Sequence, residues 1–279
     1  MSMTTPPATQ SRRHRVRANG IELAVTSYAG TGPPLLLIHG IGSRGVSWWP
    51  VIDALAGFSS PHVLDLRGHG DSDKPPSGYL LPDYARDISG VIAALGLARP
   101  WLMGHSLGGL ATLHWALENP ATAAAIVLED VPLRGGPDRL PAFDGWLALN
   151  ALPVAAAAAH FANEHPGWTA EDCYRRAESI TATAREVFIE LRAANAQEPA
   201  VRIESLATIT SPALLLHGDI ESGGMLTASE AARFAAIVPN SKVVRVPNGG
   251  HALHRDHSDS FVREVRVFLL NPRVGEGTA

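Results

Sequence analysis

The chain has 279 residues, of which 46% are hydrophobic and 18% charged, and its formal net charge at pH 7 is −4. This composition is ordinary for a globular protein, the length allows one large α/β domain, and the slight acidity argues against nucleic acid as a partner. The lone cysteine, Cys173, excludes an intramolecular disulfide, so we expect a fold that does not depend on an oxidising compartment.

The N-terminal stretch from Met1 to Arg13 is polar and contains Pro6 and Pro7, with no apolar core of the kind found in signal peptides. We expect residues 1–13 to form a disordered tail. No other stretch is long and apolar enough to cross a membrane. The sequence therefore predicts a cytoplasmic protein without a membrane partner.

Apolar runs alternate with segments of helical periodicity along most of the chain. Asn19-Gly20 lies between two extended runs and predicts a β-hairpin over Arg15–Tyr28. The later strands are expected at Leu35–Ile38, His62–Leu66, Trp101–Met103, Ala125–Leu128, Ala213–Leu216 and Lys242–Val246. The helices are expected at Val46–Ala56, Pro82–Leu95, Gly109–Glu118, Thr227–Ile237 and Ser258–Leu270. This alternation predicts an α/β fold with a mostly parallel sheet and helices on both faces.

The alternation stops between residues 133 and 207, where the sequence is rich in alanine and helical in pattern. We expect this segment to form a helical cap. It would divide the α/β core into residues 14–132 and 208–279. In parallel sheets, ligands bind at the carboxyl ends of the strands, and we expect the cap to cover that edge.

The most informative stretch is Gly104-His105-Ser106-Leu107-Gly108, which lies between an expected strand and an expected helix. Strand, G-x-S-x-G and helix together are typical of a nucleophile elbow. The turn must be very tight to lift the serine hydroxyl out of the chain, so side chains two residues before and after would collide. We predict Ser106 as a catalytic nucleophile, and we expect His105 beside it to line the substrate pocket or to pack against its neighbours.

A serine hydroxyl needs a base at neutral pH, and twelve histidines compete for that role. His251 follows Gly249-Gly250 in the loop between the last strand and the last helix, and flanking glycines would let it approach Ser106. His254 and His257 are expected to be exposed at the start of that helix. His39 and His69 are expected to bind loop backbone.

The acid that orients His251 has two main candidates. Glu221 follows the strand before the histidine's strand, and Asp130 follows the strand after the nucleophile's helix. Either side chain could reach the far nitrogen of the imidazole. Asp219 is a weaker third candidate, and the residues alone leave the choice open.

The sequence Gly40-Ile41-Gly42-Ser43-Arg44-Gly45 has two interpretations. On one, the backbone N–H groups of Ile41 and of Leu107 converge on an oxyanion. On the other, the literal G-x-G-x-x-G pattern, with Asp65 at the end of the next strand, binds a dinucleotide in an oxidoreductase. The second interpretation gives Ser106 and His251 no role, so we favour the oxyanion loop.

The chain resembles the α/β-hydrolase superfamily in its capped, esterase-like branch. The residues that carry the resemblance are His39-Gly40, Asp65 to Ser72, Gly104 to Gly109, His217-Gly218-Asp219 and Gly249-Gly250-His251. The resemblance implies an eight-stranded sheet with the cap inserted after the sixth strand, Ser106 as nucleophile and His251 as base. It places the usual acid at Glu221, whereas relatives such as haloalkane dehalogenases carry it at the position of Asp130.

We therefore expect a serine hydrolase that cleaves a small, fairly apolar carboxylic ester through an acyl-enzyme, without a cofactor or a metal ion. Trp48 and Trp49 follow the oxyanion loop as candidates for the acyl pocket. We expect at least one of the two to pack against the helix instead, and we predict that Trp48 lines the pocket. The alternative is a ligand receptor or cofactor-free oxygenase that keeps the fold without ester turnover. The sequence does not indicate the natural substrate or the oligomeric state.

Overall fold

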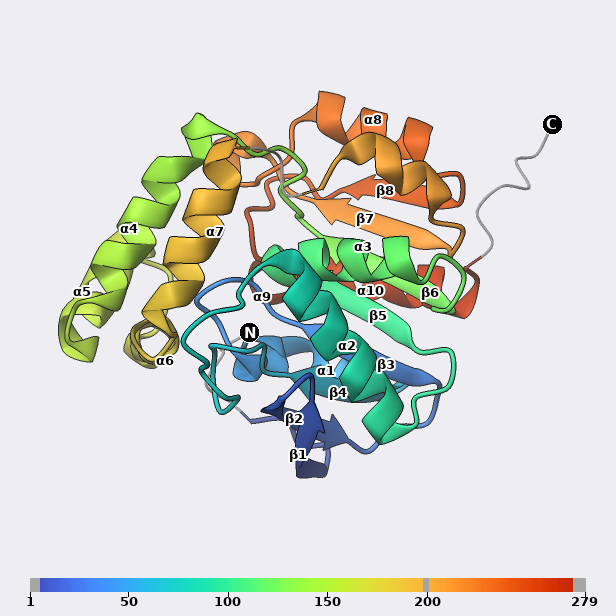
Figure 1. Ribbon diagram of the computed structural model, residues 1–279, viewed down its shortest axis with the longest axis horizontal. Coiled ribbons are helices and arrows are strands. Elements are labelled where there is room, and N and C mark those ends of the chain that lie inside the picture. The colour runs from blue at the N-terminus through green and yellow to red at the C-terminus, as the bar shows by residue number, and fades with distance from the viewer. Residues whose placement is uncertain (1–5, 198–200, 273–279) are drawn as a thin grey trace.

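The computed structural model describes residues 6–197 and 201–272 and contains one eight-stranded sheet (Figure 1). The strands are β1 (Ser11–Ala18), β2 (Ile21–Tyr28), β3 (Pro34–Ile38), β4 (Ser60–Leu64), β5 (Trp101–His105), β6 (Ala125–Glu129), β7 (Ala213–His217) and β8 (Ser241–Arg245). Their spatial order is β1-β2-β4-β3-β5-β6-β7-β8. The first two strands pair antiparallel, β2 meets β4 antiparallel, and every later pairing is parallel.

The local sequence accounts for the sheet. Asn19 and Gly20 have φ angles of 49° and 81°, the left-handed pair that a two-residue hairpin turn requires. The central strands β5, β6 and β7 are buried at every position, as continuous apolar runs should be when helices cover both faces.

Helices lie on both faces of the sheet. One face carries α2 (Leu81–Leu95), α3 (Leu107–Glu118) and α8 (Ala228–Ile237), and the other carries α1 (Trp49–Ala56) and α10 (Ser258–Leu270) (Figure 1). Each face has its own apolar core. The α/β-hydrolase architecture that the resemblance implied is present.

Four α-helices stand between β6 and β7: α4 (Leu140–Asn150), α5 (Val154–Glu164), α6 (Ala170–Thr181) and α7 (Arg185–Gln197). They lie beside the sheet rather than on either face, with α4 next to α7 and α5 next to α6 (Figure 1). We call them the cap helices. They have their own apolar cluster, which includes Ala157, Phe161, Ala177, Ile180 and Phe188.

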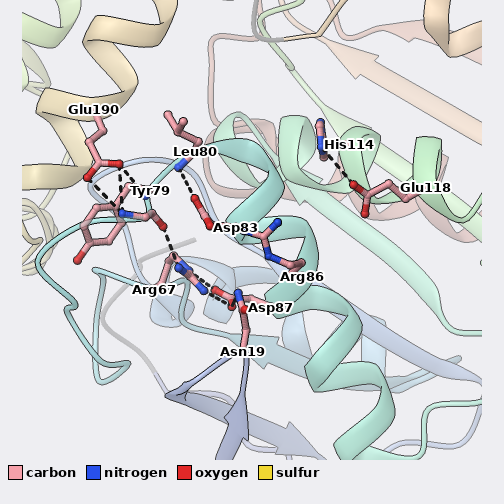
Figure 2. Close-up of polar contacts among 11 residues, drawn as sticks. Asn19, Arg67, Tyr79, Leu80, Asp83, Arg86, Asp87, His114, Glu118 and Glu190 are labelled. Carbon is pink, nitrogen blue, oxygen red and sulfur yellow. Dashed lines mark hydrogen bonds and ion pairs between the residues drawn. The ribbon is translucent and has the colours of Figure 1, made fainter.

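Glu190 of α7 joins the cap helices to the core (Figure 2). Its carboxylate accepts hydrogen bonds from the backbone N–H groups of Gly78, at 3.3 Å, and Tyr79, at 2.9 Å. The carbonyl of Gly78 in turn accepts a bond from Arg67, whose guanidinium forms a buried, two-bond ion pair with Asp87 of α2. The loop that touches the cap is therefore fixed to a buried charge pair of the core.

Several boundaries differ from expectation. Strand β1 begins at Ser11, inside the expected tail, and Ala8 and Thr9 donate hydrogen bonds to Asp53, so residues 6–13 do not behave as a free tail. Strand β4 ends two residues earlier than expected because the Leu66 N–H turns away to donate to His39. The helix expected from Val46 starts as a 3₁₀ turn, Gly45–Trp48, and becomes α-helical at Trp49, where the following proline fits the first turn.

None of the helices in the described part of the chain combines the length and apolar character that a membrane crossing needs.

Candidate active site

Ser106 occupies the strained turn that its flanking glycines predict. It lies between β5 and α3 with φ 51° and ψ −115°, a conformation that costs a non-glycine residue energy. A Cβ on Gly104 would lie 2.4 Å from the carbonyl oxygen of Gly108, and one on Gly108 would lie 2.2 Å from that of Ile38. Because both neighbours are backbone atoms, neither position has room for a side chain. The turn holds Ser106 at the N-terminus of α3, where the helix dipole favours negative charge.

His251 and Asp130 form a hydrogen-bonded pair. The imidazole Nδ1 of His251 lies 2.7 Å from Oδ2 of Asp130, whose carboxylate is fully buried. That carboxylate also accepts the backbone N–H groups of Met225, at 2.9 Å, and Gly218, at 3.4 Å. Its orientation is thus fixed by three donors, and Nε2 of His251 is left for the cavity that Ser106 also borders.

The structure distinguishes the acids that the sequence left open. Asp130 lies against His251, whereas Glu221 is exposed on the short 3₁₀ turn Ile220–Ser222. Asp219 is bound elsewhere, because it accepts bonds from Arg245 and from the backbone of Asn248. The Arg245 guanidinium lowers the pKa of the Asp219 carboxyl below its ordinary value. Of the three carboxylates, Asp130 is the one placed to orient the imidazole.

Ile41 and Leu107 border one cavity together with Ser106. Leu107 is the first residue of α3, so its N–H has no carbonyl partner within the helix. Neither this N–H nor that of Ile41 has a hydrogen-bond acceptor among the described residues. Two unused backbone donors beside a nucleophile are what an oxyanion hole requires.

Two buried histidines hold the loop that carries Ile41. His39 Nε2 accepts the N–H of Leu66 at 3.0 Å, and His69 Nε2 accepts the N–H of Gly42 at 3.1 Å. Each Nδ1 lies within 2.9 Å of a backbone carbonyl, to which it donates. Both rings must therefore be neutral, and burial lowers the pKa of each below its ordinary value. This agrees with the expectation that both bind loop backbone.

His105 borders the larger cavity, but its imidazole is engaged with protein. Nε2 lies 2.8 Å from the carbonyl oxygen of His251, which fixes that nitrogen as a donor. The ring centroid is 4.5 Å from that of His251 and 5.2 Å from that of His254. Burial, reinforced by these two neighbouring imidazoles, holds the pKa of His105 well below its ordinary value. Through Nε2, His105 thus supports the loop that carries His251, and its ring also borders the cavity as expected.

The expectation that His254 is exposed is wrong. Its side chain is 3% exposed, and its Nδ1 lies 2.8 Å from both carboxylate oxygens of Glu129, which also accepts the backbone N–H of His254. A second buried histidine–carboxylate pair therefore lies behind His105. The sequence contained a signal for this pair. Glu129 and Asp130 stand side by side at the end of β6, and two histidines, His251 and His254, follow β8 three residues apart.

The prediction that Trp48 lines the substrate pocket is also wrong. Its side chain has no exposed surface, and its indole packs 4.3 Å from the His254 ring and 6.4 Å from that of Phe261. The 3₁₀ turn rotates Trp48 into the core, so that Val46 and Ser47 face the cavity instead.

Ser106 lies where two cavities meet. The larger, of about 500 Å³, contains His251 and polar residues, and the smaller, of about 250 Å³, contains mainly apolar side chains. The two share Ile41, Ser106 and Trp146. The smaller cavity is lined chiefly by Leu80, Leu81, Leu107, Leu110, Phe143 and Leu191. A bound molecule could thus place one part in each cavity with its reacting bond at the serine.

The Gly40–Gly45 loop does not have the arrangement of a dinucleotide site. Asp65, which the oxidoreductase interpretation assigned to a ribose, accepts the N–H of Gly45 at 2.6 Å and that of Asp71 at 3.0 Å. Its carboxylate holds two loops together. Within residues 6–197 and 201–272, no three histidine, cysteine, aspartate or glutamate side chains converge as ligands for a metal ion.

Comparison with known proteins agrees with this architecture. Residues 33–258 match the family model of the alpha/beta hydrolase fold. The chain is 30% identical to the N-formylmaleamate deformylase of Pseudomonas putida over 93% of this chain and 97% of that protein. It is 25% identical to the pimeloyl-[acyl-carrier protein] methyl ester esterase of Aliivibrio salmonicida over 86% of this chain and 93% of that protein.

Among solved structures, that of E-2-(acetamidomethylene)succinate hydrolase superposes with a TM-score of 0.80 at 26% identity, covering 93% of this chain and 99% of that one. The family match spans most of the sheet, the Ser106 turn and the His251 loop. The chain belongs to the α/β-hydrolase fold family.

Proposed function

We propose that this protein is a serine hydrolase that cleaves carboxylic esters through a covalent acyl-enzyme. The observation that carries the proposal is the 2.7 Å contact between His251 and the buried Asp130, on the edge of the cavity that contains the strained Ser106. Nucleophile, orienting acid and base follow one another along the chain in the order Ser106, Asp130, His251, which is the order found in α/β-hydrolases.

The proposed reaction has two halves. In the first, His251 removes the hydroxyl proton of Ser106 as the oxygen attacks the ester carbonyl, and the N–H groups of Ile41 and Leu107 bind the resulting oxyanion. His251 then protonates the departing alcohol, which leaves Ser106 acylated. In the second half, water repeats these steps and releases the acid. Asp130 keeps Nδ1 of His251 protonated, so that Nε2 is the nitrogen that takes up the proton and then returns it in each half of the reaction.

The experiment is active-site labelling combined with ester turnover. The wild-type protein should bind one equivalent of a fluorophosphonate at Ser106 and release nitrophenolate from p-nitrophenyl butyrate with an initial burst. Ser106→Ala should abolish both. Labelling at another residue, or full turnover by the Ser106→Ala protein, would refute the mechanism, and absence of both labelling and turnover in a folded wild type would favour the non-hydrolytic receptor or oxygenase.

A second candidate is hydrolysis of a C–N bond, because the relative that is 30% identical over 93% of this chain is a deformylase. The same groups would perform it, with His251 protonating an amine in place of an alcohol. The two candidates are separated by the ratio of kcat/KM for p-nitrophenyl butyrate to that for the matching anilide. A ratio near one would favour amide cleavage, since esters are intrinsically much more reactive.

A further inference from the structure

The larger cavity is bordered by three arginines that differ in their charge partners. Arg175 Nη2 lies 2.9 Å from Glu171, and Arg255 Nε lies 2.8 Å from Asp256. Arg176 has no carboxylate within 4 Å among the described residues. Arg176 is thus the cation in this cavity whose charge the protein leaves uncompensated.

Acidic side chains at the cavity do not change this assignment. Asp256 is paired with Arg255, and Glu164 lies 3.6 Å from His160 at the outer end of α5. Both carboxylates border the cavity, but neither is in contact with the guanidinium of Arg176. Its positive charge is therefore available to a bound molecule.

Contacts hold Arg176 in one place. Its Nη1 donates to the carbonyl of Gly42, and its guanidinium lies 5.1 Å from the ring centroid of Phe161. Burial, with a contribution from Arg255, lowers the pKa of Arg176 to about 10. A cation in such a place is costly to bury without an opposite charge. Nε and Nη2 have no acceptor among the described residues, which leaves a planar pair of donors.

Arg176 lines the same cavity as Ser106 and is bonded to the loop that carries Ile41. Gly42, to which it is bonded, directly follows Ile41, and both Ile41 and Ser106 border the cavity that Arg176 lines. Ser106 also borders the cavity of about 250 Å³, which is mainly apolar and whose lining includes Arg139. The site thus offers the guanidinium of Arg176 in one cavity and mainly apolar side chains in the other.

We propose that the substrate of this enzyme carries a carboxylate, which pairs with Arg176 while an apolar part occupies the smaller cavity. This inference rests on the proposed hydrolase function, and it changes the expected substrate from a fairly apolar ester to an acidic one. When the carboxylate is on the acyl part of the ester, hydrolysis adds water across the acyl C–O bond and yields a dicarboxylic acid and an alcohol.

The kinetic test compares two methyl esters of similar shape, monomethyl succinate and methyl 4-methylpentanoate, by product formation in chromatography. A charge-assisted contact is worth about 1.5–3 kcal/mol, or roughly 10- to 100-fold in kcat/KM. Arg176→Met should lose this factor for monomethyl succinate and change little for the neutral ester, and Arg176→Lys should recover part of it. Arg185→Met is the matched control. Like Arg176, Arg185 belongs to a cap helix and donates to a backbone carbonyl, that of Leu147, but it lies outside the cavity.

Equal losses for both esters in Arg176→Met would show a structural role and overturn the inference, as would a wild-type preference for the neutral ester. A binding arm separates this inference from the hydrolase proposal. Succinate, titrated by calorimetry into Ser106→Ala, should bind at least about tenfold more weakly when Arg176→Met is added. If neither ester is cleaved but this loss is seen, the hydrolase proposal fails and the carboxylate site stands. Unchanged succinate binding overturns the carboxylate site.

Discussion

Replacing Asp130 by asparagine tests the proposed triad with the smallest change in shape. In the structure, Oδ2 of Asp130 accepts from both His251 and the backbone N–H of Met225, and Oδ1 accepts from Gly218. An amide has one oxygen and one NH₂ group. Whichever way the asparagine side chain turns, its NH₂ faces at least one N–H donor.

The expected loss follows from these contacts. If the amide oxygen keeps the place of Oδ2, His251 retains its tautomer but the charge that stabilises its protonated form is gone. If NH₂ takes that place, Nδ1 must give up its proton and Nε2 can no longer act as the base. The corresponding substitution in serine proteases, a standard example, lowers kcat about 10⁴-fold, so we expect a loss of about 10³- to 10⁴-fold for Asp130→Asn. An unsatisfied buried donor should also lower the free energy of unfolding by about 1–3 kcal/mol.

The assay is kcat for p-nitrophenyl butyrate, with urea unfolding measured in parallel. Glu221→Gln is the matched control, because that carboxylate is exposed, and it should change kcat less than twofold. A loss of under tenfold in folded Asp130→Asn protein would contradict the assignment. A large loss in Glu221→Gln would reinstate the acid that the structure places outside the site.

Three further changes test other parts of the structure. Gly108→Ala would place a Cβ 2.2 Å from the carbonyl oxygen of Ile38. Urea unfolding should therefore show an unfolding free energy lower by about 1–3 kcal/mol, and turnover should fall. Wild-type values for both would contradict the steric argument. The lowered pKa values of His39 and His69 mean that the unfolded chain takes up their protons first as the pH falls below about 6.5. Each histidine should therefore lower the unfolding free energy by about 1.4 kcal/mol per pH unit until its folded pKa is reached. The His69→Gln substitution should reduce the slope of unfolding free energy against pH by that amount. An unchanged slope would argue against a neutral buried ring. Glu190→Ala removes the acceptor of the two backbone N–H groups that join α7 to the core. The unfolding free energy should fall by about 1–3 kcal/mol, and the hydrogen of the Tyr79 amide should exchange faster. Unchanged exchange would show that the cap is held by other contacts.

The sequence predicted the parts of the fold that short-range patterns control. The hairpin follows from Asn19-Gly20, the buried strands from apolar runs, and the Ser106 turn from glycines whose missing side chains leave room for backbone. These features depend on residues that are neighbours along the chain. They predict an α/β fold with a mostly parallel sheet, and the resemblance of the motifs to the α/β-hydrolase superfamily implies the particular fold.

The features that the sequence missed depend on loops folding together. Whether Asp130 or Glu221 meets His251 is decided by where the loops after β6 and β7 turn, across a sequence separation of 121 residues between His251 and its partner. The burial of His254 likewise depends on Glu129, which is 125 residues away at the end of β6 and accepts hydrogen bonds from the backbone and the ring of His254. Trp48 was misplaced because a 3₁₀ turn advances about three residues per turn where a helix advances 3.6, which changes the face that each side chain occupies.

The contacts that fix the proposed triad all come from the core. Asp130 is held by His251, Gly218 and Met225, and the carbonyl of His251 is held by His105. None of these partners belongs to the four cap helices of the described chain. The proposed reacting groups are therefore fixed by the core, whereas the cap helices contribute part of the cavity lining, Trp146, Phe161 and Arg176 among it. Exchange of the inserted helices for those of a distant homologue, by recombination or in the laboratory, should redirect the enzyme to new compounds while its chemistry passes on intact.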